Sequence, residues 1–87
     1  MKIEFDPAKQ METLIKRGLD MADAGLVFEG THKTFDDDRY DYGETRHITV
    51  GHLNGRMVYI AWTRRGDARR IISMRKANAR EIGKYQF

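Results

Sequence analysis

The sequence has 87 residues, of which 40% are hydrophobic and 33% charged, with a net charge of +3 and no cysteine. This length predicts a single domain over residues 1–87 with a small core, and the lack of cysteine excludes disulfides, thiolate nucleophiles, cysteine zinc sites and iron–sulfur clusters. Because no segment approaches the roughly 20 apolar residues of a membrane helix and the N-terminus lacks the apolar segment of a secretory signal, we expect a cytoplasmic protein with no membrane partner.

The first part of the chain predicts a short strand followed by an amphipathic helix. Ile3 and Phe5 alternate with charged neighbours, as expected of a strand. Asp6 and Pro7 then open a helix, because aspartate accepts hydrogen bonds from the free N–H groups of the first turn and proline fits the first helical position. Gly18 ends this helix. Its apolar residues at spacings of three and four share one face, namely Met11, Leu14 and Ile15.

A second helix is predicted to begin at Asp20 and to stop at Gly30, with Asp23 near its positive end. Its apolar residues again recur at helical spacing, and we expect them to face the interior: Met21, Ala24, Val27 and Phe28.

The middle of the chain predicts an antiparallel meander. The expected segments are, in order, an edge strand over residues 31–35, a polar loop over 36–43, and strands over 45–53, 56–63 and 68–75. Two turns connect the long strands, Asn54-Gly55 and Gly66-Asp67, of which the first is the stronger hairpin signal. The strand over residues 56–63 is apolar on both faces and is therefore expected at the centre of the sheet.

A short C-terminal helix is predicted from Asn78 and Glu81, which form a capping-box pattern, and it carries Ile82 and Tyr85. The predicted fold class is therefore α+β. It consists of an antiparallel sheet with two N-terminal helices and a short C-terminal helix, the helices packing on one face of the sheet.

Basic residues are concentrated in the C-terminal half of the chain. Residues 56–84 include only two acidic side chains, Asp67 and Glu81, against nine basic ones: Arg56, Arg64, Arg65, Arg69, Arg70, Arg75, Lys76, Arg80 and Lys84. Acidic residues gather instead over residues 36–44. This asymmetry suits the binding of a polyanion on one face of the molecule.

Arginine is the residue type that the sequence places where strands end. Arg64 and Arg65 end the predicted central strand. Arg75 and Lys76 end the next one, and Arg80 lies near the N-terminus of the last helix, where anions bind well. Since neighbouring antiparallel strands run in opposite directions, Arg65 and Arg75 meet only if the connection folds back or the two side chains share a face. The sequence leaves both arrangements open.

Such arginines suit the chemistry of RNA cleavage. An arginine fork binds a phosphate through two hydrogen bonds and stays charged at physiological pH. When the 2′-hydroxyl of RNA attacks the adjacent phosphate, guanidiniums stabilise the charge that develops on the nonbridging oxygens, with roughly 3 kcal/mol per donor. Arginine is a poor proton acceptor, so the candidates for a general base are His47, His52 and Glu44.

Each of these residues also has a purely structural interpretation. Arginines at strand ends are more often solvated surface, and the two histidines are more often exposed strand residues than catalysts. The acidic run over residues 36–38 lacks the ligand spacing of a calcium loop, so we expect a solvated connection there and predict no metal and no cofactor. Trp62 and Tyr59 are core candidates first and base-stacking surfaces second.

Three C-terminal segments form a longer pattern: Thr63-Arg64-Arg65-Gly66-Asp67, then Arg70-Ile71-Ile72-Ser73-Met74-Arg75-Lys76-Ala77, then Arg80-Glu81. They closely resemble the T-E-R-G-D turn, the R-I-I-S-A-R-K-A strand end and the R-E pair of the BrnT family of type II toxins. Earlier segments agree with the same family: Phe5-Asp6 with Lys9, Lys16-Arg17-Gly18, Val27-Phe28 and Gly43-Glu44-Thr45-Arg46. The resemblance spans nearly the whole chain.

The resemblance implies a RelE-like ribonuclease fold and a metal-independent endoribonuclease that cleaves RNA and inhibits translation. It also implies a cognate BrnA-like antitoxin that neutralises the toxin and carries the DNA-binding part, so that DNA would be contacted only through the antitoxin. Carried over by position, the catalytic residues would be Arg65, Arg75 and Arg80. The residues expected to help position RNA are Arg64, Lys76 and Arg46.

The chain departs from the family pattern at three positions. Arg17 stands where the family usually has histidine, Arg64 where it has glutamate, and Met74 where it has alanine. The first change removes a possible proton-transfer group, and the second should favour RNA affinity.

The alternative hypothesis is a noncatalytic nucleic-acid-binding module, in which the same arginines only neutralise backbone charge. That interpretation needs no general base, and it predicts salt-sensitive binding without a covalent product. A third possibility is a protein-interaction domain whose basic face meets an acidic partner.

Overall fold

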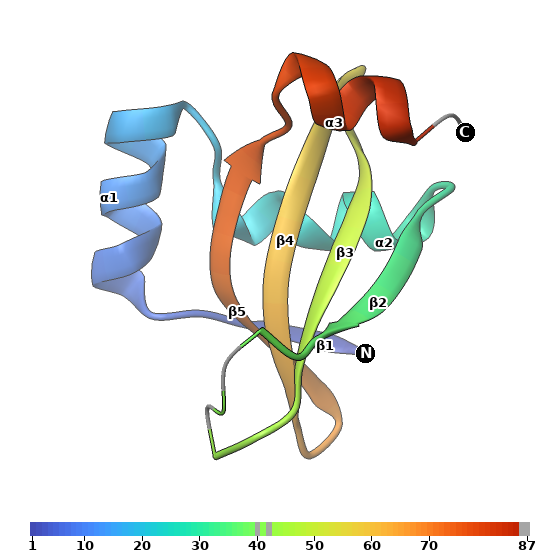
Figure 1. Ribbon diagram of the computed structural model, residues 1–87. Helices are drawn as coiled ribbons and strands as arrows, with labels where there is room; N and C mark the ends of the chain where they lie inside the picture. The colour runs from blue at the N-terminus through green and yellow to red at the C-terminus, as the bar shows by residue number, and fades with distance from the viewer. Residues whose placement is uncertain (40, 42, 86–87) are drawn as a thin grey trace.

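The computed structural model describes residues 1–39, 41 and 43–85. Its elements are, in chain order, β1 (Lys2–Glu4), α1 (Pro7–Arg17), a 3₁₀ turn η1 (Met21–Asp23), α2 (Ala24–Glu29), β2 (Lys33–Asp37), β3 (Arg46–Leu53), β4 (Arg56–Arg65), β5 (Ala68–Lys76) and α3 (Ala79–Lys84). Figure 1 shows these elements around one five-stranded sheet, which confirms the predicted α+β class. Among the described helices, none has both the length and the apolar character that a membrane crossing requires.

The sheet has the strand order β1-β5-β4-β3-β2. Strands β2 to β5 form the predicted antiparallel meander, and β4 lies at its centre as its two apolar faces indicated. The expectation of a wholly antiparallel sheet is wrong at one edge, where β1 pairs with β5 in parallel, from Lys2 beside Ala68 to Glu4 beside Arg70. No hairpin connects these two strands, so the helices between them allow the chain to cross over and return in the same direction.

The two predicted turns have the backbone conformations that their sequences favour. Asn54 and Gly55 both have positive φ, at 52° and 78°, and join β3 to β4 as a tight hairpin. Gly66, with φ of 61°, lies in the turn between β4 and β5. The second turn brings Arg65 into register with Ala68 at the tip of the β4–β5 hairpin.

The N-terminal helices begin and end where capping residues predicted. Asp6 accepts a hydrogen bond from the amide of Ala8 (2.9 Å) at the start of α1, and Gly18 ends that helix in the left-handed conformation. Asp20 caps the next segment in the same way, although the chain first forms the 3₁₀ turn η1 and only then α2. That second segment ends at Gly30 as predicted.

The edge strand β2 lies two residues later than predicted, and it includes part of the expected loop over residues 36–43. Two acidic side chains hold this extension in place, which explains the shift. Asp36 accepts a hydrogen bond from Nδ1 of His47 on β3 (2.9 Å), and the carboxylate of Asp37 binds the guanidinium of Arg39. Residues 40 and 42 of the predicted loop, like residues 86 and 87 of the predicted domain, lie outside the described part of the chain.

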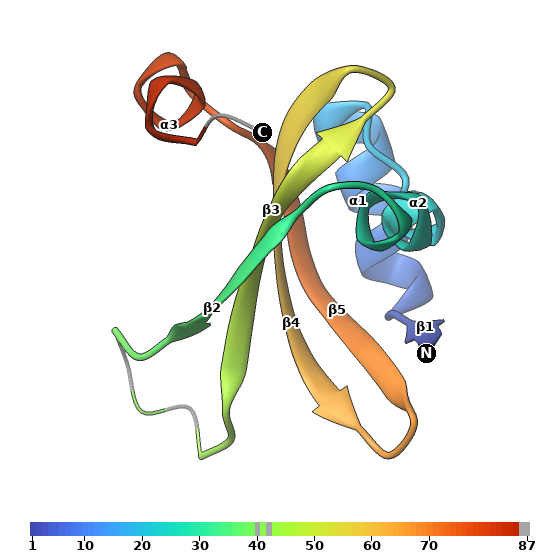
Figure 2. The same cartoon turned by 90° about the vertical axis from the view of Figure 1, so that its right-hand side faces the viewer.

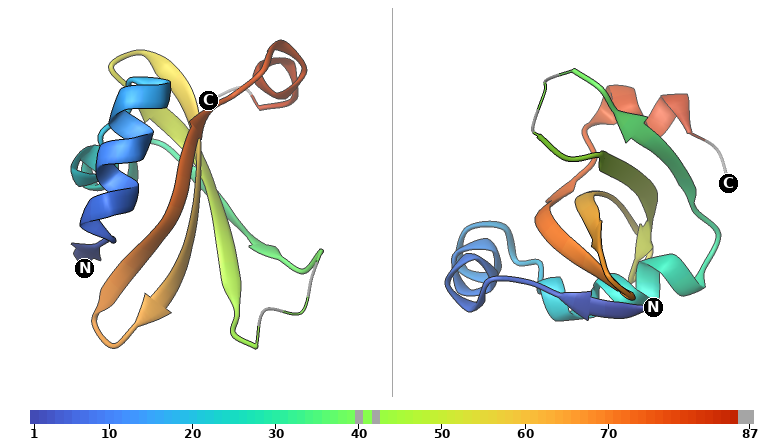
Figure 3. Two further views of the ribbon diagram at one scale, coloured as in Figure 1. Left: turned by 90° about the vertical axis from the view of Figure 1, so that its left-hand side faces the viewer. Right: turned by 90° about the horizontal axis from the view of Figure 1, so that it is seen from below.

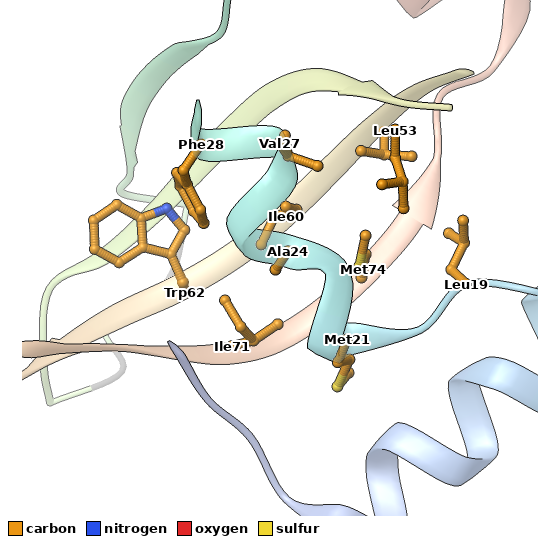
Figure 4. Close-up of a cluster of buried hydrophobic side chains, with 11 residues drawn as sticks. Leu19, Met21, Ala24, Val27, Phe28, Leu53, Ile60, Trp62, Ile71 and Met74 are labelled. Atoms are coloured by element: carbon orange, nitrogen blue, oxygen red, sulfur yellow. The ribbon is translucent and has the colours of Figure 1, made fainter. Parts of the chain in front are cut away.

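The main core fills the space between α2 and one face of the sheet, which we call the α2 face (Figure 4). The four residues predicted to point inward from the second helix are all buried: Met21, Ala24, Val27 and Phe28. They pack on side chains of the long strands: Leu53, Val58, Ile60, Trp62, Ile71 and Met74. Burial of each large side chain contributes roughly 1.5–3 kcal/mol. Trp62 is buried as predicted, and its indole N–H donates to the hydroxyl of Thr49 (2.8 Å).

Helix α1 does not turn its apolar face to this core. Met11, Leu14 and Ile15 are 58%, 42% and 75% exposed, while the buried residue of the helix is Thr13. Polar contacts orient the helix instead: Gln10 donates to Asp20 (2.8 Å), and Arg17 donates to the carbonyl of Met74 on β5 (2.8 Å). Arg17, one of the three departures from the family pattern, therefore links the end of α1 to the sheet.

The prediction that all helices pack on one face is also wrong. Figure 2 and Figure 3 show α1 and α2 on one side of the sheet and α3 on the other, the α3 face. A second, smaller cluster lies on the α3 face, comprising Ile48, Val50, Met57 and Ala77 with Tyr59, Ala61 and Tyr85 against it. Because the inner strands β3 and β4 are apolar on both sides, the sheet needs cover on both faces, and α3 supplies part of the second cover.

Candidate functional site

A groove of about 900 Å³ opens on the α3 face of the sheet. Its floor is formed by small or flat side chains from three strands: Ile48, Tyr59, Ala61 and Ser73. Helix α3 forms one wall, and the segment Asp36–Arg39, at the end of β2 and just beyond it, forms the other. Figure 2 shows where these two elements lie. The α3 side carries Arg80 and Lys84 with Glu81, and the β2 side carries carboxylates together with Arg39, so an anion is favoured most along α3 and β5.

Arg75 is fixed at the α3 end of this groove. It lies in register with Tyr59, and its guanidinium stacks 4.5 Å from the centre of the tyrosine ring. Both of its terminal nitrogens donate to the carboxylate of Glu81, at 2.8 Å each, and Nη1 also donates to the carbonyl of Lys76 (3.3 Å). A guanidinium has five donor hydrogens, so these three contacts leave two, one on Nε and one on Nη2, for a further acceptor.

The Arg75–Glu81 pair changes the ionisation of both partners. The hydrogen bond from Arg75 lowers the pKa of Glu81 to about 2, and the same bond raises the pKa of Arg75. Both groups are therefore charged across the physiological range. Glu81 is consequently a weak proton acceptor at neutral pH.

Helix α3 places Arg80 in the lining of the same groove as Arg75. Asn78 accepts a hydrogen bond from the amide of Glu81 (2.8 Å), and the Glu81 carboxylate accepts one from the amide of Asn78 (3.0 Å), which completes the predicted capping box. Arg80 is the second residue of the helix and lines the groove, as does Lys84 one turn later. Within residues 1–39, 41 and 43–85, Arg80 forms no ion pair with a carboxylate.

Three aromatic rings surround the same end of the groove. The Phe35 and Tyr85 rings are nearly parallel, with centroids 6.4 Å apart, and the Tyr59 and Tyr85 rings meet edge to face at 6.1 Å. Burial raises the pKa of Tyr59 to about 12, so its hydroxyl stays protonated and can donate a hydrogen bond. Rings beside arginines are typical of surfaces that bind single-stranded RNA.

The sequence interpretation missed Tyr85 and Phe35 as groove residues. Tyr85 was predicted only as part of the C-terminal helix, and Phe35 only as part of an edge strand. Their positions depend on α3 crossing to the second face of the sheet, which no local pattern indicates. A usable signal was the presence of aromatic residues among basic ones near the C-terminus.

The structure separates the predicted catalytic arginines into two groups. Arg75 lies opposite Tyr59 on β4, whereas Arg65 lies at the far end of the same strand, opposite Ala68. Six residues of β4 separate these two register positions, which corresponds to about 20 Å at roughly 3.3 Å per residue. By the alternation of the strands both side chains belong to the α3 face, but one phosphate cannot contact both. Arg80 therefore joins Arg75, and Arg65 does not.

The predicted RNA-positioning residues fall into the same two groups. Arg46 pairs with Thr63 and Arg64 pairs with Arg69, so both lie at the turn end of the sheet with Arg65. Lys76 pairs with Val58 of the main core, and its side chain therefore begins on the α2 face, opposite to that of Arg75.

None of the predicted general bases lies in the groove. His47 is on the α2 face, where its ring contacts Trp62 with centroids 4.6 Å apart while Nδ1 donates to Asp36. Glu44 lies 3.8 Å from Nε of Arg46, at the turn end of the sheet. His52 pairs with Met57 near the β3–β4 turn and does not line the groove.

One residue of the acidic run over residues 36–38 departs from the solvated connection expected there: Asp36 and Asp38 are exposed, whereas Asp37 is buried. The side chain of Asp37 is only 4% exposed, and its two oxygens bind Nε and Nη2 of Arg39 at 2.8 and 3.1 Å. In the described part of the chain, no three histidine or acidic side chains are grouped closely enough to bind a metal ion.

Two comparisons with known proteins bear on the family of this chain. A comparison with curated proteins found no similar sequence. The family model described as the ribonuclease toxin BrnT of a type II toxin–antitoxin system matches residues 5–81, which include strands β2 to β5 and the helices up to Glu81 in α3 but not β1. The chain therefore belongs to the BrnT family of ribonuclease toxins, which act with an antitoxin partner.

Proposed function

We propose that this ribonuclease toxin cleaves RNA in the groove on the α3 face, without a metal ion, and thereby inhibits translation. The observation that carries the proposal is the position of Arg75. Glu81 and Tyr59 hold its guanidinium in one orientation and leave two of its N–H groups for an acceptor. Arg80 lines the same groove and has no ion-pair partner among the described residues.

The proposed reaction is attack of the RNA 2′-hydroxyl on the adjacent phosphorus. The bond to the 5′-oxygen breaks, and the products end in a 2′,3′-cyclic phosphate and a 5′-hydroxyl. Arg75 and Arg80 hold the nonbridging oxygens, where negative charge develops in the transition state. Tyr59 orients Arg75 through its ring, and its own hydroxyl is hydrogen-bonded to Tyr85. Glu81 and Tyr59 do not titrate near neutral pH, and in this proposal solvent water takes the proton of the 2′-hydroxyl and returns one to the departing 5′-oxygen.

The aromatic rings of the groove supply the binding surface for the bases. Tyr85 and Phe35 lie beside the basic wall of α3, so bases flanking the cut can stack there while the arginines hold the backbone. This arrangement favours single-stranded RNA, because paired bases are not free to stack on protein rings.

The antitoxin partner of the family is proposed to be BrnA-like and to contact DNA on behalf of the complex. Cellular RNA is the substrate of such a toxin, so its place of action is the cytoplasm. An antitoxin neutralises the activity most simply by covering the groove through the basic wall formed by α3.

The test is incubation of the purified protein with a defined RNA in EDTA, followed by analysis of the product ends. We expect 2′,3′-cyclic phosphate ends with the native protein and a loss of rate of about 10²-fold or more with Arg80→Ala, since one transition-state donor is removed. Lys9→Ala, which removes an exposed cation from α1, is the matched control and should cleave normally. Intact RNA despite tight binding by the native protein would favour the noncatalytic binding module instead.

A further inference from the structure

Four arginines at the turn end of the β4–β5 hairpin lack acidic partners. We call them the distal arginine cluster: Arg64, Arg65, Arg69 and Arg70. Within the described ranges, no carboxylate forms an ion pair with any of the four guanidiniums. The acidic residue of the turn, Asp67, contacts Lys2 instead (3.7 Å). By contrast, Arg75 at the other end of β5 is paired with Glu81.

This arrangement is unfavourable in the isolated protein. Arg64 and Arg69 lie directly opposite each other on neighbouring strands, a position in which like charges are destabilising. Burial and the charge of Arg64 both lower the pKa of Arg69, with burial as the larger cause. The Nε of Arg69 is buried without a hydrogen-bond partner in the described part of the structure. A bound anion would offset the repulsion between these like charges.

The core holds one member of the cluster in a fixed orientation. The guanidinium of Arg69 lies 3.9 Å from the ring centre of Phe28 and 5.2 Å from that of Trp62. Both rings belong to the main core, so Arg69 is ordered before any ligand arrives. An ordered guanidinium loses less entropy on binding a phosphate than a free surface lysine does.

Arg65 and Arg70 of the cluster lie on the α3 face, as the groove does, whereas Arg64 and Arg69 lie on the α2 face. Arg70 pairs with Thr63 on β4, and Arg75 pairs with Tyr59, four residues away on that strand. At roughly 3.3 Å per residue these positions are about 13 Å apart, too far for one phosphate but within the length of a short RNA strand. Between them the surface carries only the small side chains of Ala61 and Ser73. A strand can therefore pass along β5 at a distance from the carboxylates of β2.

We propose that the distal arginine cluster binds the RNA phosphate backbone several nucleotides away from the scissile bond. This inference rests on the proposed cleavage in the groove on the α3 face. RNA is favoured over an acidic protein segment because none of the large exposed apolar side chains of the described structure lies within residues 63–70. A protein interface usually has an apolar centre, whereas backbone binding needs only charge.

The inference is tested by comparing RNA lengths. Binding of 2′-O-methyl RNA of mixed sequence, which resists cleavage, is measured at about 4 and about 16 nucleotides over a range of salt concentrations. Arg65→Gln/Arg70→Gln removes the two charges that the cluster places on the α3 face, and Lys9→Gln/Lys16→Gln removes two charges from α1 as the matched control. We expect about ten-fold weaker binding of the long RNA by the hairpin variant only. For this variant the slope of log affinity against log salt concentration should be smaller by about 1.4, because each of the two lost phosphate contacts contributes about 0.7.

The short RNA should bind both variants within about two-fold of the native protein, because its few phosphates fill the groove alone. An equal loss of affinity of the hairpin variant for the long and the short RNA, or no loss for either, would overturn the inference. Normal RNA binding together with lost binding of the antitoxin would assign the cluster to the antitoxin and overturn it as well. Arg80→Gln, assayed on unmodified short RNA, separates the two proposals: normal cleavage by that variant refutes the groove as the cleavage site, whatever the hairpin variant does.

Discussion

The two ends of the β4–β5 hairpin both carry arginine, but they differ in how the charge is balanced. At the α3 end, Arg75 stacks on Tyr59 and is paired with Glu81 through two hydrogen bonds. At the turn end, Arg64 and Arg69 face each other without a carboxylate partner in the described part of the chain. The first end has one arginine oriented for one phosphate, and the second has several that share a diffuse positive potential.

This difference shows that a count of arginines along the sequence does not define a site. Orientation requires a partner that fixes the guanidinium and still leaves donors free, as Glu81 does for Arg75. Long-range attraction of a polyanion requires charges that no internal carboxylate neutralises, as at the turn end.

The largest expected effect concerns the oriented end. Arg75→Ala should lower the cleavage rate by about 10²-fold or more, equivalent to about 2.7 kcal/mol at 1.36 kcal/mol per ten-fold. Glu81→Gln should retain most of the activity, because the guanidinium and its stacking on Tyr59 remain. Single-turnover cleavage of the same RNA by both variants measures the two rates. Equal losses would mean that Arg75 acts only by anchoring α3 and contacts no phosphate.

Removing a charge should lower the free energy of unfolding at the α3 end and raise it at the turn end. Arg75→Gln breaks a bidentate ion pair, which is about half exposed, and should lower the free energy of unfolding by about 0.5–1 kcal/mol. Arg64→Gln removes a like-charge contact and should raise it by a few tenths of a kcal/mol, about the size expected for a cross-strand charge pair. Urea unfolding at low salt provides both values. A destabilised Arg64→Gln would contradict the view that the turn end is internally strained.

A smaller effect is expected from acid. The folded pKa of Glu81 is about 2, below its ordinary value of 4.5, so the stability that this group contributes is present above pH 4.5. That contribution is lost as the pH falls from about 4.5 through about 2, because the unfolded chain binds the proton first. The midpoint temperature of thermal unfolding should therefore fall less steeply between pH 5 and about 2 for Glu81→Gln than for the native protein. Parallel curves for the two proteins would show that the pair does not form in solution.

Local sequence rules predicted much of the fold because they concern neighbouring residues. Asp6, Gly18 and Asn54-Gly55 act within a few residues of themselves, and each has the predicted conformation. The face on which α3 lies depends on contacts between Tyr85 and strands far away in the sequence, and no periodicity encodes such contacts.

The candidate site shows the same limit. Arg75 and Arg80 could be selected from the sequence, but their separation from Arg65 follows only from the register of β4 and β5. His47 was a reasonable base by residue type, yet the side of β3 on which it lies turns it toward Trp62. Tyr85 lines the groove because α3 lies on the second face of the sheet, a position that the sequence did not predict.

The parallel pairing of β1 with β5 has a consequence for how the protein folds. Lys2 pairs with Ala68, so the contact that completes this edge of the sheet joins residues 66 positions apart, a high contact order for a small protein. During synthesis β1 has no partner until β5 has been made, whereas each hairpin of the meander can form as soon as its second strand appears. Closure of this pair is therefore expected to limit the folding rate, and until it occurs the outer edge of β5 remains open to pairing with other chains.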